Sequence, residues 1–107
     1  MGGATTEVTS YDQFNDLIKN SSNLVVVDFW ASWCGPCMRI APAYAKLSEE
    51  FPNVSFLKVD VDNAEEVSSK CDIKAMPTFQ FYKNGEKIEE FKGANEKALR
   101  EAVQKHQ

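Results

Sequence analysis

Hydrophobic residues along the chain fall into short runs that predict the strands of a sheet. Residues 24–30 are rich in β-branched side chains and almost wholly apolar, which is typical of a strand covered on both faces in the middle of an α/β sheet. Residues 54–61 form the next run, and residues 78–82 alternate as a strand does. A short first strand is expected at residues 7–9.

A β-hairpin is predicted directly after residues 78–82. Asn84 and Gly85 both tolerate positive φ, so this pair favours a two-residue turn. In the return strand, Ile88 and Phe91 are three positions apart, whereas regular alternation would place them two apart. That slip indicates a β-bulge.

Two helices are predicted in the first half of the chain. Ser10 and Gln13 fit a capping box, in which each side chain binds a free N–H group at the start of a helix. Residues 34–50 are rich in helix formers. The apolar side of this second helix is expected to consist of Met38, Ala41, Ala45 and Leu47.

Two further helices complete the expected order. Asn63 is expected to cap a short helix that ends near Lys70, and residues 93–95 open a last helix. The first half of the chain can make parallel crossovers, whereas the hairpin must be antiparallel. We therefore expect one α/β domain, residues 1–107, with a mixed sheet and helices on both faces. The buried side of the last helix is expected to consist of Leu99, Ala102 and Val103.

Length and charge exclude several classes of function. A chain of 107 residues has room for one domain. Its formal net charge of −4 argues against nucleic acid as the main partner, because phosphate binding needs a basic face. The longest aliphatic run, residues 24–27, is far shorter than the ~20 residues that span a bilayer.

The first residues contain no basic segment followed by an apolar stretch, so they do not resemble a secretory signal. We expect a protein that stays inside the cell, or one whose signal has been removed. Gly2 and Thr6 fit the loose pattern for N-myristoylation, although a flexible start explains these residues as well.

The candidate chemistry centres on Cys34 and Cys37, which follow the buried strand at the start of a helix. The first N–H groups of a helix have no internal partners and carry the positive end of its dipole. A Cys34 thiolate would be stabilised there and should form more readily than in free cysteine. Cys37 lies one turn further along, so the two sulfur atoms can meet. Pro36 stiffens the turn at a position where its missing N–H is not needed.

Two alternative roles for these cysteines are a structural disulfide and a zinc site. A structural disulfide is disfavoured for a short loop in an intracellular chain. A zinc site could use Cys34, Cys37, Cys71 and His106. Zinc pairs normally sit on knuckle-like turns, whereas a strand and a helix flank this pair, so redox chemistry is favoured.

Asp28 interrupts the apolar central strand. Burial without a charged partner raises the pKa of a carboxyl group, so Asp28 could take the proton of Cys37 and return it. Lys58 interrupts the neighbouring strand in the same way and could pair with Asp28, although a solvent-facing position explains Lys58 equally well.

Three further residues and one peptide bond have simpler interpretations. Trp30 is expected in the core, Trp33 on the surface beside the thiol, and His106 exposed near the end of the chain. Most X–Pro bonds are trans, so the sequence alone predicts a trans bond between Met76 and Pro77.

The motif Trp33-Cys34-Gly35-Pro36-Cys37 resembles the active-site signature of the thioredoxin family. Residues 28–32, 56–62, 75–79 and 91–94 also resemble the family in order and spacing, so the resemblance runs essentially from end to end. It implies the thioredoxin fold, a mixed five-stranded sheet flanked by four helices. It also implies a protein disulfide reductase that cycles between a dithiol and a disulfide.

The resemblance implies a role for each site residue. Cys34 would be the attacking thiolate and Cys37 the resolving cysteine of a redox-active disulfide, while Asp28 and Lys58 would manage the proton. The Met76–Pro77 bond would be cis, and the Met76 backbone would pair with an extended substrate peptide. The implied docking surface consists of Trp33, Gly35, Pro36, Ala75, Met76, Pro77, Gly93 and Ala94.

Partners and location are implied as well. The chain would bind no cofactor and would receive electrons from NADPH through a flavoprotein thioredoxin reductase, as a cytoplasmic monomer acting on disulfide-containing proteins. Gly35 and Pro36 put no positive side chain between the cysteines, which favours a reductant over an oxidase or isomerase. A redox-silent binding module is the alternative. Cys71 is either a small buried apolar residue or a regulatory thiol.

Overall fold

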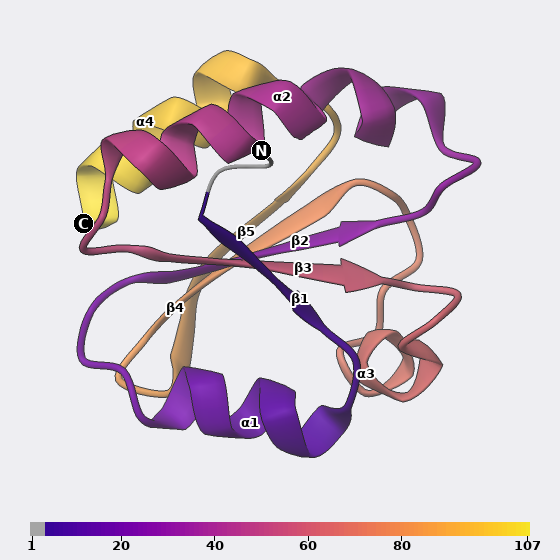
Figure 1. Ribbon diagram of the computed structural model, residues 1–107, viewed down its shortest axis with the longest axis horizontal. Helices are drawn as coiled ribbons and strands as arrows, with labels where there is room; N and C mark the ends of the chain where they lie inside the picture. Colours follow the sequence, from indigo (N-terminus) through magenta and orange to yellow (C-terminus); the bar gives the residue numbers. More distant parts are fainter. Residues whose placement is uncertain (1–3) are drawn as a thin grey trace.

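The computed structural model describes residues 4–107, with a five-stranded sheet at its centre (Figure 1). β1 (Thr5–Val8), β3 (Ser55–Asp60) and β2 (Val25–Trp30) are parallel and adjacent in that order. β4 (Thr78–Lys83) pairs antiparallel with β2, and β5 (Glu86–Lys92) pairs antiparallel with β4. The apolar β2 is therefore the middle strand, as its sequence predicts.

Helices cover both faces of this sheet (Figure 1). In the described part of the chain, α1 (Tyr11–Lys19) and α3 (Glu65–Lys70) lie on one side. α2 (Gly35–Glu50) and α4 (Glu96–His106) lie on the other. The two faces have separate apolar cores, and alternate residues of β2 contribute to one core and then to the other. The predicted mixed sheet flanked by four helices is confirmed.

The helix starts agree only partly with the sequence signals. The Ser10 hydroxyl accepts a hydrogen bond from the Gln13 N–H at 3.1 Å, so the cap of α1 is confirmed. The predicted cap of α3 is wrong, because Ala64 occupies the capping position and Asn63 instead donates to the Asp60 carboxylate. The first strand also begins two residues earlier than expected, at Thr5.

The hairpin between β4 and β5 is confirmed. Asn84 and Gly85 both have positive φ, 54° and 82°, as a two-residue hairpin turn requires. The pairing register shifts between Phe81 and Tyr82, and this shift is the predicted bulge. Ile88 is skipped by the register and remains 40% exposed.

The rotation of α2 about its axis differs from the sequence prediction. Met38 is 43% exposed, and Ala41 and Ala45 are only half-buried, so of the four residues expected on the apolar side only Leu47 is buried. The Tyr44 hydroxyl explains the difference, because it donates at 2.6 Å to the Leu57 carbonyl of the sheet and holds the Tyr44 side of the helix inward. The side chains that α2 buries are Cys37, Ile40, Tyr44, Leu47 and Ser48.

Within residues 4–107, no helix is both long enough and apolar enough to cross a bilayer. The candidate lipidation position, Gly2, lies outside the described residues.

Candidate active site

Cys34 and Cys37 form a disulfide at the N-terminus of α2. Their Cα atoms are 5.3 Å apart, as the helical spacing of the pair allows. Cys34 is the N-cap residue, and its sulfur accepts a hydrogen bond from the Cys37 N–H at 3.2 Å. The same N–H group and the dipole of the helix would stabilise a thiolate on Cys34 after reduction.

The disulfide is packed into the surface. Cys34 is 6% exposed and Cys37 is 2% exposed, so Cys34 is the more accessible of the two sulfur-bearing residues. Cys34 Sγ lies 3.7 Å from the Met76 carbonyl oxygen. The Met76–Pro77 bond is cis, in agreement with the family resemblance and against the expectation from the sequence alone.

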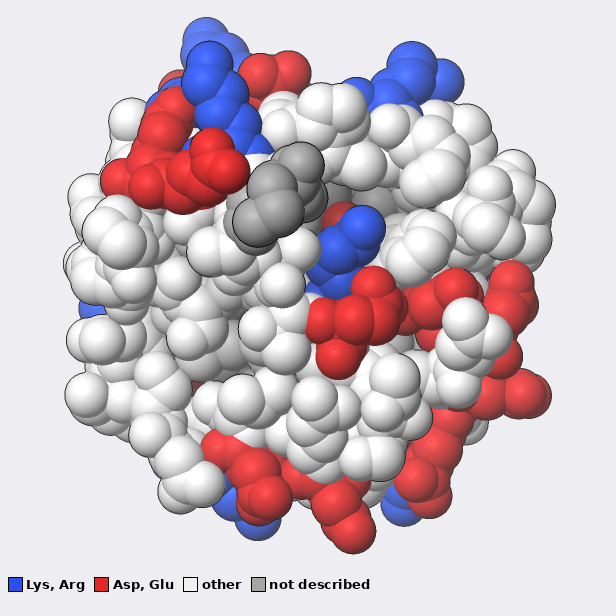
Figure 2. Space-filling model, in the orientation of Figure 1, with Lys and Arg blue, Asp and Glu red and all other residues white. Residues whose placement is uncertain are grey.

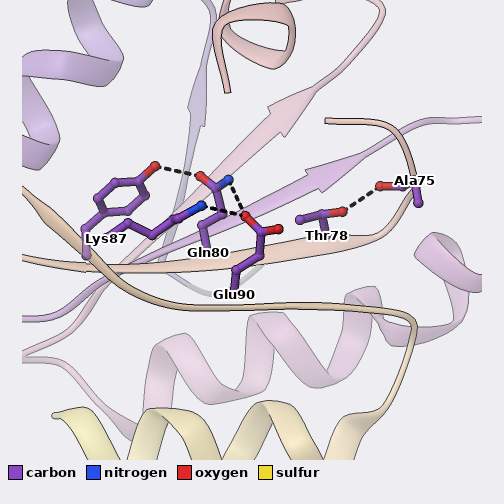
Figure 3. Close-up of polar contacts among 6 residues, drawn as sticks. Ala75, Thr78, Gln80, Lys87 and Glu90 are labelled. Atoms are coloured by element: carbon purple, nitrogen blue, oxygen red, sulfur yellow. Dashed lines mark hydrogen bonds and ion pairs between the residues drawn. The ribbon is translucent and has the colours of Figure 1, made fainter. Parts of the chain in front are cut away.

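A hydrogen bond holds the loop that faces Cys34. The Thr78 hydroxyl donates to the Ala75 carbonyl at 2.6 Å, across the residues that lead into β4 (Figure 3). The Pro77 carbonyl in turn accepts from the Gly93 N–H at 2.9 Å. These two contacts bring the segments at residues 75–77 and 93–94 together beside the disulfide.

The expected docking residues differ in exposure. Trp33 is 67% exposed, and its indole N–H donates to the Asp62 carboxylate at 2.9 Å. Met76 is half-buried, and Pro77 is buried. The remaining members of the set, Gly35, Pro36, Ala75, Gly93 and Ala94, are exposed.

Asp62 is a hydrogen-bond partner of Trp33 that the sequence alone did not predict. It follows β3, while Trp33 follows β2, and these strands are parallel neighbours. The carboxyl ends of parallel strands meet at one edge of a sheet. An acidic residue two positions after the end of β3 was therefore the signal that could have placed Asp62 beside Trp33.

Asp28 is the buried carboxyl group of the site. It is 1% exposed, and within residues 4–107 its Oδ1 atom has no hydrogen-bond partner. Burial raises the pKa of Asp28 from 3.8 to about 7, and the positive charge of Lys58 offsets part of that rise. This side chain can therefore exist in both protonation states near neutral pH.

Lys58 is the register partner of Asp28 on β3, as the sequence analysis suggested. The lysine is half-buried, not fully solvent-facing, and its Nζ atom lies 4.5 Å from the centre of the Trp30 ring. Trp30 is half-buried and packs against the cluster of Ala31, Cys34 and Cys37, so the prediction that it is a core residue holds only in part. A cavity of about 350 Å³ beside α2 has Lys58 and Tyr44 in its wall.

Cys71 and His106 take part in contacts away from the disulfide. Burial raises the pKa of the half-buried Cys71 thiol, which packs near Tyr82. His106 pairs with Glu89, and its side chain is only 18% exposed, so the prediction of an exposed histidine is wrong. In residues 4–107 no three His, Cys, Asp or Glu side chains are grouped to hold a metal ion, and the zinc alternative has no support.

Comparison with known proteins identifies the family of this chain. The family model for thioredoxin matches residues 5–105. The chain belongs to the thioredoxin family. A thioredoxin from Ictalurus punctatus is 55% identical over 102 residues, covering 92% of this chain and 95% of that protein. The X-ray structure of Fasciola hepatica thioredoxin has a TM-score of 0.92 and 46% identity, over 95% of this chain and 99% of that one.

Membership of this family, together with the Cys34–Cys37 disulfide in the active-site position, makes the chain a dithiol–disulfide oxidoreductase. It reduces disulfides by thiol–disulfide exchange, and a thioredoxin needs no bound cofactor for this reaction. The interpretation as a redox-active dithiol is confirmed, and the alternative of a redox-silent binding module is set aside.

Proposed function

We propose that this chain reduces disulfides of protein substrates with Cys34 as the attacking thiolate and Cys37 as the resolving cysteine. The observation that carries this assignment is the position of the Cys34 sulfur as the N-cap of α2. A thiolate there receives the Cys37 N–H and faces the positive end of a 16-residue helix. Cys37 is the more buried residue of the pair, which suits a thiol that acts within the protein.

The exchange proceeds in two balanced steps. In the first, the Cys34 thiolate attacks a substrate disulfide, so that a mixed disulfide forms and one substrate sulfur leaves as a thiolate. In the second, Cys37 loses its proton and attacks Cys34 Sγ, which releases the second substrate thiolate. Two electrons pass to the substrate, and the chain is left with the Cys34–Cys37 disulfide.

Asp28 would accept the proton of Cys37 in the second step. A general base works best when its pKa lies near the working pH, and burial brings the pKa of Asp28 to about 7. Lys58 stands beside Asp28 and also lines the cavity next to α2, which supports proton exchange with solvent by this route.

Substrate would dock on the exposed surface around the disulfide. Trp33 is its largest exposed apolar side chain, and the Met76 carbonyl beside Cys34 would pair with an extended peptide. Pro77 is buried and would shape this surface more than touch the substrate. The full set proposed is Trp33, Gly35, Pro36, Ala75, Met76, Pro77, Gly93 and Ala94.

The oxidised chain must be reduced again after each cycle. We assign this step to a flavoprotein thioredoxin reductase that draws electrons from NADPH. The chain would work as a single-domain cytoplasmic monomer, residues 1–107. Cys71 would take no part in the cycle, because its raised pKa leaves less of the reactive thiolate.

The assignment of the two cysteines predicts that Cys37→Ser traps substrate. Without the resolving thiol, the mixed disulfide on Cys34 cannot be released by the second step. We expect a covalent adduct between the reduced variant and a disulfide-containing insulin peptide, visible by intact mass and lost on adding dithiothreitol. Cys34→Ser is the matched control and should form no such adduct. An adduct on Cys34→Ser, or its absence on Cys37→Ser, would reverse the assignment.

The docking surface predicts a substrate-dependent effect of Trp33→Ala. Loss of a large exposed aromatic anchor should lower kcat/KM for insulin by about 5–10-fold. A small disulfide reagent does not need the surface, so its rate should change little. Ile88→Ala is the matched control, since Ile88 is an exposed apolar residue on β5. Equal losses with insulin and the small reagent would argue against docking through Trp33.

A further inference from the structure

Three charged side chains form one row across the sheet. Lys58 on β3 is the register partner of Glu7 on β1 and of Asp28 on β2. Aligned residues on adjacent strands point to the same face. Val26 and Phe56 alternate with Val25 and Leu57 between the two apolar cores, so this row lies on the α2 side, where Tyr44 packs. Lysine thus stands between two carboxyl groups.

Among the described residues, Lys58 forms an ion pair with neither of these two carboxyl groups. Within residues 4–107 it makes no ion pair at 4.0 Å or less, and its Nζ atom lies over the Trp30 ring instead. Figure 2 shows basic atoms set in a hollow on the β1 side of the molecule, with acidic atoms directly beside them. A single positive charge is therefore available to both neighbours.

Glu7 is the outer carboxyl group of the row. It is an exposed residue on an edge strand and interacts with the charges of both Lys58 and Asp60. The negative charge of Glu7 raises the pKa of Asp28, whereas the positive charge of Lys58 lowers it. The Tyr44 phenol faces Asp28 from α2, and burial raises its pKa well above the usual range, so it stays neutral.

We propose that Glu7 is a positioning residue for the proton of Asp28, because its carboxylate shares the positive charge of Lys58 and so weakens the stabilisation that Lys58 gives to the ionised form of Asp28. The inference rests on the proposed role of Asp28 in the resolving step. Lys58 by itself favours the ionised form of Asp28, whereas a second negative charge in the row disfavours it. Glu7 thereby sets how readily Asp28 returns its proton.

Glu7→Gln tests this directly through the titration of Asp28. In the oxidised protein, the pH midpoint of the Asp28 carboxyl carbon, followed by ¹³C NMR, should fall by about 0.5 unit or more in the variant. Glu7→Asp keeps the charge and should restore most of the wild-type midpoint. Glu66→Gln removes an exposed carboxyl group on α3 and is the matched control, with no change expected. An unchanged midpoint in Glu7→Gln overturns the inference.

A kinetic measurement separates this inference from the role of Asp28. The pH profile of mixed-disulfide resolution should move to lower pH in Glu7→Gln by the same amount as the NMR midpoint, with KM for insulin unchanged. If the midpoint moves and the profile does not, Glu7 acts on Asp28 as inferred and the catalytic role of Asp28 fails. If Glu7→Gln shifts the profile equally in an Asp28→Asn background, Glu7 acts elsewhere and the inference is overturned.

Discussion

Replacing Cys34 with serine is expected to lower insulin reduction at least about 1000-fold, because a hydroxyl at this position stays protonated near neutral pH and cannot attack a disulfide. The N-cap geometry that stabilises a thiolate does not rescue an alcohol, whose ionisation is far more costly. The measurement is NADPH consumption in the presence of thioredoxin reductase and insulin.

Cys71→Ser is the control for loss of a thiol, and it should keep nearly the full rate, since Cys71 packs near Tyr82 and not near the disulfide. Fold is checked by circular dichroism for both variants. Turnover by Cys34→Ser equal to that of the wild type would refute the enzymatic role of this cysteine. A matching loss in Cys71→Ser would show that the active-site pair does not act alone.

Asp28→Asn is expected to stabilise the oxidised protein above pH 7. The carboxyl group has a pKa of about 7 in the folded chain and an ordinary value of 3.8. Between these values the folded state holds a proton that the unfolded state has lost, so the free energy of unfolding falls as pH rises from about 4 to about 7. The total fall is about 4 kcal/mol, and it is complete above pH 7.

Asparagine cannot ionise, so the free energy of unfolding of the variant should not fall in this way as the pH rises. At pH 8 its free energy of unfolding in urea should exceed that of the wild type by about 2–4 kcal/mol, whereas the two proteins should be nearly equal at pH 4. Asp16→Asn, an exposed position on α1, should retain the wild-type pH dependence. A constant difference between Asp28→Asn and the wild type at all pH values would contradict the raised pKa.

The same variant should slow the resolving step, because the amide cannot accept the proton of Cys37. The variant should therefore be more stable than the wild type and slower in the second step. This combination is expected when a buried carboxyl group contributes to the reaction and destabilises the fold. The two effects can be measured on the same protein sample, and an unchanged rate would remove Asp28 from the mechanism.

Short-range features of this protein follow from the sequence by itself. The cap at Ser10, the turn at Asn84 and Gly85, and the meeting of Cys34 with Cys37 each depend on residues within four positions of one another. Local backbone preferences are sufficient to predict such contacts. The unbroken apolar run of β2 likewise indicates a strand with both faces buried.

Longer-range features were decided by the tertiary structure. The side of α2 that is buried depends on Tyr44 reaching the Leu57 carbonyl, and His106 is covered because Glu89 lies opposite the end of α4. The row through Lys58 exists only because β3 lies between β1 and β2, and sequence order does not specify strand order. The proton affinity of Asp28 depends on that neighbourhood, since burial and nearby charges, not residue type, determine how far a carboxyl group departs from its usual pKa.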